Sequence, residues 1–179
     1  MANSKKGLIL FIMKRCLVII DVQNGFLGEN TIPVVADIKS LIENNENMFE
    51  HIVATKFINN PNSGFTDFMK WNDFMDDEST ALDPYVLQVS ETVFIKPGYT
   101  CFTDEFESFV ADKEIDYLYF VGVDTDCCVL KSAADCFERN IPFQVLMNYC
   151  RSNGGDESHK AAELVLLRMI GDYCINNNI

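Results

Sequence analysis

The predicted fold is decided by the stretch YFVGVDTDCCVLKSAADCF, residues 119–137. An apolar run suited to a buried strand leads into Gly122, a short acidic turn follows, and Cys128 stands where a helix begins. The first turn of a helix has backbone N–H groups without partners and a partial positive charge. Both favour a thiolate and stabilise a developing oxyanion. We therefore take Cys128 as the candidate nucleophile.

The same strand-then-helix pattern recurs on both sides of this stretch. Apolar runs predict strands at 16–22, 51–58, 92–96, 117–123 and 143–147, and helical spacing predicts helices at 34–49, 65–75, 103–110, 127–139 and 156–170. Residues 76–78 are expected to form a solvated turn. This alternation predicts an α/β fold, a single-domain three-layer α/β/α sandwich with a mostly parallel sheet.

The composition favours a small molecule as the partner. With 179 residues, of which 48% are hydrophobic, the chain fits one domain with a sizeable core. Its net charge of −13 comes from 27 acidic and 14 basic residues. A polyanion or an anionic membrane surface would be repelled, so we expect no nucleic-acid partner and no membrane partner.

The cysteines and the N-terminus bear on the compartment. Seven cysteines are an odd number, and several lie in apolar patterns typical of buried thiols. No segment approaches the roughly 18 apolar residues that span a bilayer. We expect a cytoplasmic protein. Residues 1–12 are interpreted as a poorly ordered N-terminal extension, and residues 13–179 as the domain.

Three reactive side chains are expected at one end of the sheet. Asp21 ends the first strand, Lys96 ends the third, and Cys128 follows the fourth after a short turn. Taken singly, each residue has a common structural explanation: an Asp caps a turn, a Lys is solvated, and a Cys packs in a core. In a parallel sheet the carboxyl ends of the strands lie together and ligands bind there, so the combination points to a site.

At three places the chain resembles the isochorismatase-like cysteine hydrolase family, which includes nicotinamidase and N-carbamoylsarcosine amidase. The matching segments are LVIIDVQNGFL at 17–27, FIKPGYTCF at 94–102 and GVDTDCCVLKSAADCFERNI at 122–141. Their order and spacing agree with the family across nearly all of residues 15–170. Three patterns in register are far more specific than any one of them.

The resemblance implies a role for each reactive residue. Asp21 is expected to be the general acid/base, Lys96 to hold charge and position, and Cys128 to attack the carbonyl carbon. Backbone N–H groups at Asp124 and Cys128 would form the oxyanion hole. The family also implies a cis peptide between Val123 and Asp124.

The resemblance also narrows the reaction. Isochorismatases proper lack the nucleophilic cysteine, so its presence favours hydrolysis of a C–N bond, as in an amidase acting on a small-molecule amide, ureido or lactam substrate. No cofactor is expected. By resemblance alone, the protein would be a homodimer or homotetramer. Cys127 occupies a variable position, and its side chain is expected to point elsewhere.

No metal site is expected. Nicotinamidase-like members bind a metal through an aspartate and paired histidines after the second strand, but ATKFINNPNSGF at 54–65 contains no histidine. His51 and His159 are too far apart for a metal-ligand spacing and are interpreted as structural. This departure speaks against nicotinamidase itself, and a metal-free amidase of nicotinamidase type is an alternative.

Aromatic residues are candidates for the walls of the substrate site. Phe26, Trp71, Tyr99 and Phe102 belong to loops or helix starts near the same end of the sheet. Aromatic walls would exclude water and hold a flat or compact substrate. The alternative for these side chains is core packing over the sheet.

Two other classes of function stay open from the sequence. A redox or thiol-binding protein is suggested by adjacent Cys127 and Cys128, although no CxxC motif supports it. A catalytically silent member of the fold, acting as a binding or scaffold subunit, is the other. The presence of Asp21, Lys96 and Cys128 together argues against both.

Overall fold

Six parallel strands form a single sheet in the order β3-β2-β1-β4-β5-β6. The structure, a computed structural model, describes residues 13–176, so the extension predicted at 1–12 lies outside the described residues. The strands are β1 (Arg15–Ile20), β2 (His51–Phe57), β3 (Thr92–Lys96), β4 (Tyr117–Val123), β5 (Phe143–Arg151) and β6 (Ile175–Asn176).

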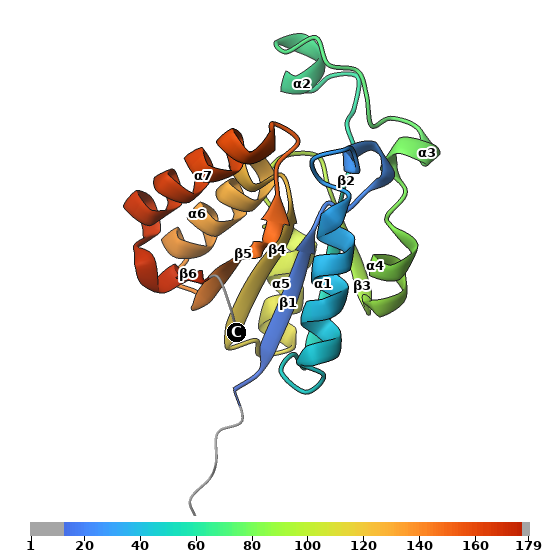
Figure 1. The fold of residues 1–179 in the computed structure, drawn as a ribbon. Coiled ribbons are helices and arrows are strands. Elements are labelled where there is room, and N and C mark those ends of the chain that lie inside the picture. The colour runs from blue at the N-terminus through green and yellow to red at the C-terminus, as the bar shows by residue number, and fades with distance from the viewer. Residues whose placement is uncertain (1–12, 177–179) are drawn as a thin grey trace, which may run out of the picture.

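Helices cover both faces of the sheet (Figure 1). They are α1 (Pro33–Asn44), α2 (Gly64–Asp67), α3 (Asp77–Thr80), α4 (Pro84–Val89), α5 (Asp104–Asp112), α6 (Leu130–Glu138) and α7 (Gly155–Ile170), with short turns η1 (Asn24–Phe26), η2 (Thr125–Val129) and η3 (Asp172–Cys174). α1 and α4 pack on one face, and α5, α6 and α7 on the other. The predicted three-layer α/β/α sandwich is confirmed.

Alternation along β1 explains why the sheet needs two helical layers. Cys16, Val18 and Ile20 face the α5, α6 and α7 side, whereas Leu17 and Ile19 face the α1 side, and all five are fully buried. A strand buried on both faces reads as a continuous apolar run, which is the pattern that predicted it.

The strand order places the reactive segments at the centre of the sheet. From β1 the chain adds β2 and β3 on one side, and then crosses to add β4 and β5 on the other. The direction in which strands are added to the sheet therefore reverses at β1, which lies between β2 and β4. Ligands of open parallel sheets bind outside the carboxyl ends of the strands at such a reversal.

The predicted helix at 65–75 is wrong. Only α2 is helical in this segment, and the chain beyond it forms an excursion that projects from the carboxyl end of the sheet (Figure 1). Lys70 and Phe74 have positive φ values of 59° and 62°, which interrupt a helix. The Asn59 side-chain amide donates to the carbonyls of Trp71 and Asp73, so tertiary contacts override the local helical pattern.

Other elements differ at their ends. The first strand ends at Ile20, α1 ends at Asn44, and β5 continues past a register shift to Arg151. The turn predicted at 76–78 is instead the entry to α3, where the Asp76 carboxylate accepts a hydrogen bond from the Ser79 N–H and caps the helix. The Thr103 cap of α5 is confirmed by its bond from the Phe106 N–H.

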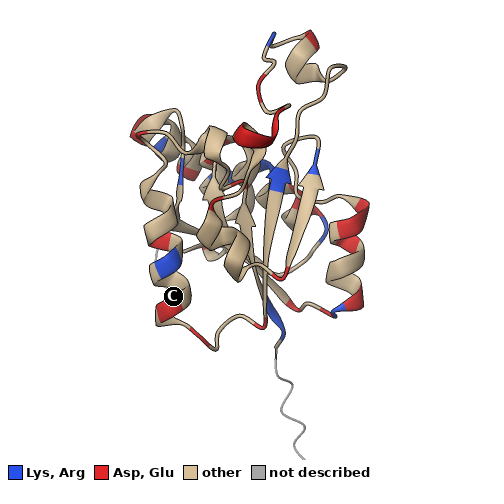
Figure 2. Cartoon of the chain, turned by 90° about the vertical axis from the view of Figure 1, so that its right-hand side faces the viewer, with Lys and Arg blue, Asp and Glu red and all other residues tan. Residues whose placement is uncertain are grey.

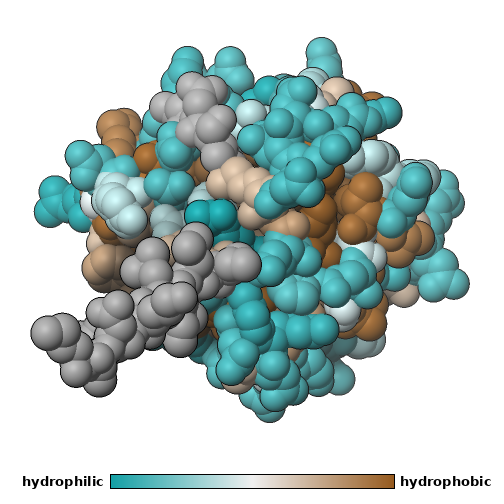
Figure 3. All heavy atoms as spheres, turned by 90° about the horizontal axis from the view of Figure 1, so that it is seen from below, coloured by the Kyte–Doolittle hydropathy of each residue, from teal (hydrophilic) through white to brown (hydrophobic). Residues whose placement is uncertain are grey.

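Acidic residues are spread over helices on both sides of the sheet, including α1 and α5 (Figure 2). The end of the molecule where the strands begin mixes hydrophilic and hydrophobic residues (Figure 3). Within residues 13–176, no helix combines the length and the apolar composition needed to cross a membrane.

Candidate active site

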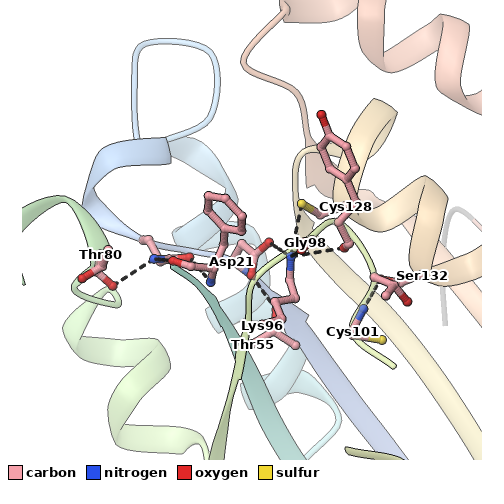
Figure 4. Close-up of polar contacts among 12 residues, drawn as sticks. Asp21, Thr55, Thr80, Lys96, Gly98, Cys101, Cys128 and Ser132 are labelled. Atoms are coloured by element: carbon pink, nitrogen blue, oxygen red, sulfur yellow. Dashed lines mark hydrogen bonds and ion pairs between the residues drawn. The ribbon is translucent and has the colours of Figure 1, made fainter. Parts of the chain in front are cut away.

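The structure brings Asp21, Lys96 and Cys128 together at the carboxyl end of the sheet (Figure 4). Lys96 Nζ lies 2.6 Å from Asp21 Oδ2 and donates to Cys128 Sγ at 3.4 Å. Asp21 and Lys96 are fully buried, and Cys128 is 6% exposed. Three segments distant in the sequence thus supply a carboxylate, an ammonium and a thiol to one enclosed space.

Asp21 is oriented by β2. It follows the last residue of β1 with a φ of 49°, and its backbone N–H donates to Thr55 Oγ1 at 3.2 Å. The same hydroxyl donates to Asp21 Oδ1 at 2.7 Å. With one carboxylate oxygen held by Thr55 and the other by Lys96, the side chain has a single orientation.

The Lys96 ammonium has protein groups as partners for all of its hydrogen-bond donors. Besides Asp21 and Cys128, its ammonium donates to the carbonyls of Gly98 at 2.8 Å and Tyr99 at 3.2 Å. Burial disfavours the cation, but the neighbouring Asp21 and Cys128 outweigh burial and raise the pKa of Lys96 above its ordinary value. Lys96 therefore stays charged, although it has no contact with solvent.

Cys128 rests as a thiol. Burial raises its pKa well above the ordinary value, the Asp21 carboxylate raises it further, and Lys96 opposes both. The helix start was expected to favour a thiolate, but in this site burial and Asp21 outweigh that effect. A reaction through the thiolate would first require loss of this proton, and the Asp21 carboxylate is the neighbouring base.

The turn that carries Cys128 is a π-helical turn, η2, which precedes α6. Three hydrogen bonds, two to the segment between β5 and α7 and one to α7 itself, hold its start. Asp124 Oδ1 accepts from the Asn153 backbone at 2.8 Å, Ser152 Oγ donates to Asp126 Oδ1 at 2.6 Å, and Thr125 Oγ1 bonds with His159 Nδ1 at 2.8 Å. These bonds fix the position of the nucleophile.

Two features of Asp124 accompany this anchoring. The Val123–Asp124 peptide bond is cis. Burial raises the pKa of the Asp124 carboxyl to about 6, while Asn153 opposes the rise by donating from both its backbone and its side chain. At neutral pH Asp124 is mainly a carboxylate held by two donors.

A cavity of about 540 Å³ opens above the thiol. It is lined by residues of η1, of the excursion (residues 58–75, between β2 and α3) and of η2, and by residues that end or follow β2, β3, β4 and β5. These residues are Gly25, Phe26, Phe57, Phe65, Met69, Trp71, Asp73, Phe74, Tyr99, Asp124, Cys127, Cys128 and Asn153. Phe26, Trp71 and Tyr99 were predicted to line the site, and the structure places all three in this wall. Its volume suits a small organic molecule.

Phe102 does not line this cavity, which corrects the fourth predicted wall residue. Its side chain is 7% exposed, packs edge-on against Phe106 and lies under the Arg139 guanidinium at 4.5 Å. After Lys96 the chain leads into α5. Phe102 therefore belongs to the core on the face of the sheet that α5, α6 and α7 cover.

Cys127 also differs from expectation. It lines the same cavity as Cys128, and both residues belong to the π-helical turn η2. Only Cys128 receives the Lys96 bond. Burial raises the pKa of Cys127 to about 11, so it is a neutral wall residue.

Several site residues were missed from the sequence. Thr55 orients Asp21. The Gln23 side-chain amide donates to the carbonyls of Phe57, at the end of β2, and of Thr80, at the end of α3, and it accepts from the Phe57 N–H. Asp73 lies in the cavity wall because the 65–75 segment is not a helix. The sequence could not indicate that Thr55 orients Asp21, because the strand that lies beside Asp21 depends on the order of the strands in the sheet.

Both histidines bond to protein groups away from the catalytic cluster. His51 Nδ1 lies 2.5 Å from Glu91 Oε1, and His159 bonds with Thr125. Burial lowers the pKa of His159, so its ring is neutral at neutral pH. Within the described part of the chain, no group of three His, Cys, Asp or Glu side chains has an arrangement that could hold a metal ion.

The model of the isochorismatase domain matches residues 15–173. The chain belongs to the isochorismatase family. No curated protein sequence matches it. Among solved structures, an isochorismatase-like hydrolase from Alkaliphilus metalliredigens superposes with a TM-score of 0.75 at 19% identity, covering 87% of this chain and 92% of that chain.

Two further solved members of the fold are similar to the same extent. A nicotinamidase/pyrazinamidase from Bacillus subtilis gives a TM-score of 0.75 at 19% identity, with 92% of this chain and 100% of that chain covered. The N-carbamoylsarcosine amidase from Thermoplasma acidophilum gives 0.74 at 19%, covering 92% and 95%. At these identities the likeness shows the isochorismatase fold, while the activity rests on the site.

Proposed function

We propose that this protein is a cysteine hydrolase that cleaves the C–N bond of a small-molecule amide through a thioester on Cys128. One observation carries the proposal. A buried carboxylate and a buried ammonium meet at a thiol that opens into a cavity of about 540 Å³. Each of the three groups has a task in amide hydrolysis.

In the first half-reaction, Cys128 adds to the carbonyl carbon while its proton passes to Asp21. The tetrahedral intermediate carries an oxyanion, which backbone N–H groups at Asp124 and Cys128 stabilise. Asp21 then returns the proton to the nitrogen, the C–N bond breaks, and ammonia or an amine leaves. The acyl group stays on sulfur as a thioester.

In the second half-reaction, water replaces the amine. Asp21 takes a proton from water, the oxygen attacks the thioester carbonyl, and the C–S bond breaks. The sulfur recovers its proton from Asp21, and the carboxylic acid leaves. Lys96 stays protonated throughout and stabilises the negative charge that alternates between sulfur and carboxylate.

The proposed substrates are carboxamides, ureido compounds and lactams, and the proposed reaction needs no metal. Both histidines already have protein partners outside the cavity, which supports metal independence. A chelator should leave the rate unchanged. A rate that falls with chelator and returns with added metal would refute this part of the proposal.

The test is ammonia release from a panel of small amides by the native protein, by Cys128→Ala and by Cys174→Ser. Cys174 is a half-buried thiol outside the cavity, so its variant controls for loss of a cysteine. We expect turnover in the native and control proteins, and loss of at least about a thousandfold in Cys128→Ala.

The same comparison separates the proposal from a silent scaffold subunit. Equal, slow background hydrolysis by all three proteins would favour the scaffold. Full activity in Cys128→Ala would refute a covalent mechanism at this thiol.

A further inference from the structure

The wall of the cavity contains a cluster of aromatic rings. Phe65 lies edge-on to both Trp71 and Tyr99, with centroids 5.7 and 5.0 Å apart, and Phe26 lies 6.4 Å from Trp71. Clustered rings of this kind bind ammonium groups, because the ring faces carry partial negative charge.

The charged groups of the cavity all have one sign. Of the described lining residues, Asp73 and Asp124 carry carboxylates, and none is Lys, Arg or His. Lys96 lies behind Cys128, and its donors are taken by Asp21, Cys128 and two backbone carbonyls. A carboxylate on the substrate would therefore meet two carboxylates and no available cation.

Asp73 is held in place within the aromatic wall. Trp71 Nε1 donates to Asp73 Oδ2 at 2.7 Å, which joins the carboxylate to the edge of the indole. The Asn59 amide donates to the backbone carbonyls of both residues at 3.2 and 3.1 Å. Since a carboxylate has about four acceptor sites, Asp73 keeps the capacity to bind a cationic ligand.

We propose that the cavity selects amides whose acyl group carries an ammonium cation, bound between the Asp73 carboxylate and the rings around Trp71. This inference rests on the proposed hydrolase function and adds its substrate class. The net charge of −13 acts in the same sense, because it attracts cations and repels anions during encounter.

The test uses two amides of the same shape. In 4-(trimethylammonio)butanamide the terminal group is a cation, and in 5,5-dimethylhexanamide a carbon replaces the nitrogen. Both would be hydrolysed to a carboxylate and ammonia, and three methylene groups separate the charge from the carbonyl. The ratio of their kcat/KM values is measured in the native protein, in Asp73→Asn and in Asp67→Asn.

Asp67→Asn is the matched control, because Asp67 is an exposed carboxylate on the same excursion that does not line the cavity. We expect the native protein to prefer the cation by about tenfold or more. Asp73→Asn should lose most of that preference, whereas Asp67→Asn should keep it. A ratio near one in the native protein, or an equal ratio in native and Asp73→Asn, would overturn the inference.

Binding is measured separately, so that a failed hydrolase proposal does not hide the result. Trp71 is the only tryptophan, and its fluorescence reports on the wall directly. Tetramethylammonium should quench or shift this fluorescence in the native protein and in Cys128→Ala, but much less in Asp73→Asn. If tetramethylammonium has no more effect than sodium at the same concentration, the cavity holds no ammonium site.

Discussion

Asp21, Lys96 and Cys128 lie buried together at the base of the cavity. Asp21 forms an ion pair with Lys96, and the thiol beside them is neutral because burial and Asp21 raise its pKa. In the proposed mechanism, the nucleophile is activated when Asp21 accepts its proton. A thiol that stays neutral between turnovers is also protected from alkylation and oxidation.

Replacing Asp21 separates its two effects. In Asp21→Asn the carboxylate charge that raises the pKa of Cys128 is gone, so the thiolate should form at lower pH than in the native protein. Amide hydrolysis should nevertheless fall by about 10²–10⁴-fold, because the base is lost. The thiolate is followed by its ultraviolet absorbance, with Cys128→Ser as the blank. A midpoint that moves to higher pH would contradict this account.

Replacing Lys96 should be costly for stability. Lys96→Met leaves the fully buried Asp21 carboxylate without its cation, and breaking a buried ion pair in this way costs about 3–5 kcal/mol. Urea unfolding measures the loss. The double variant Asp21→Asn/Lys96→Met removes both charges and should recover part of it; a double variant less stable than the single one would show that the ion pair is not the cause.

The meeting of Asp21, Lys96 and Cys128 at one end of the sheet was predictable from the sequence, but the protonation of the thiol was not. Asp21, Lys96 and Cys128 were identifiable because each ends or follows a strand and lies in a specific motif. The pKa of Cys128 depends on burial and on its distance from a carboxylate, which only the assembled site defines. Phe102 was wrongly predicted to line the substrate site, because the sequence does not show in which direction the chain turns after β3.

At the scale of elements, β1 and β4 determine where the site forms. Gly122 pairs with Ile20 and has a φ of 115°. A Cβ at this position would lie 2.2 Å from the Ile20 carbonyl oxygen, so glycine is required where the two strands come together just before η2.

Gly122→Ala should therefore destabilise the protein by more than about 2 kcal/mol, because it adds both a steric clash and a strained φ. Gly98→Ala is the control, since a Cβ there meets no atom within 4 Å. Thermal unfolding of the two variants measures the difference. Equal melting temperatures would show that β1 and β4 can separate at no cost.

Two of the core strands, β3 and β4, were predictable to the residue, whereas the end of β5 and the excursion were not. β3 and β4 occupy the predicted ranges because buried parallel strands read as apolar runs bounded by turn residues. In residues 65–75 the aromatic spacing suggested a helix, but Phe65, Trp71 and Phe74 line the cavity and Asn59 holds the backbone. Local spacing cannot distinguish those two arrangements.

At the scale of the whole molecule, the homodimer or homotetramer stays a prediction. Light scattering should give two or four times the mass of the chain, and a mass equal to one chain would remove it. The oligomeric state can be tested apart from activity, because the candidate site and the cavity wall are formed by residues of one chain.

The central claim is that the acyl group passes through Cys128. The most direct measurement is acid quenching during turnover of an amide that the protein hydrolyses, followed by mass spectrometry of the intact protein and its peptides. The account predicts a mass increase equal to the acyl group, located on Cys128 and absent from Cys128→Ala. Steady hydrolysis with no acyl group on Cys128, and with the Cys128→Ala variant still active, would contradict it.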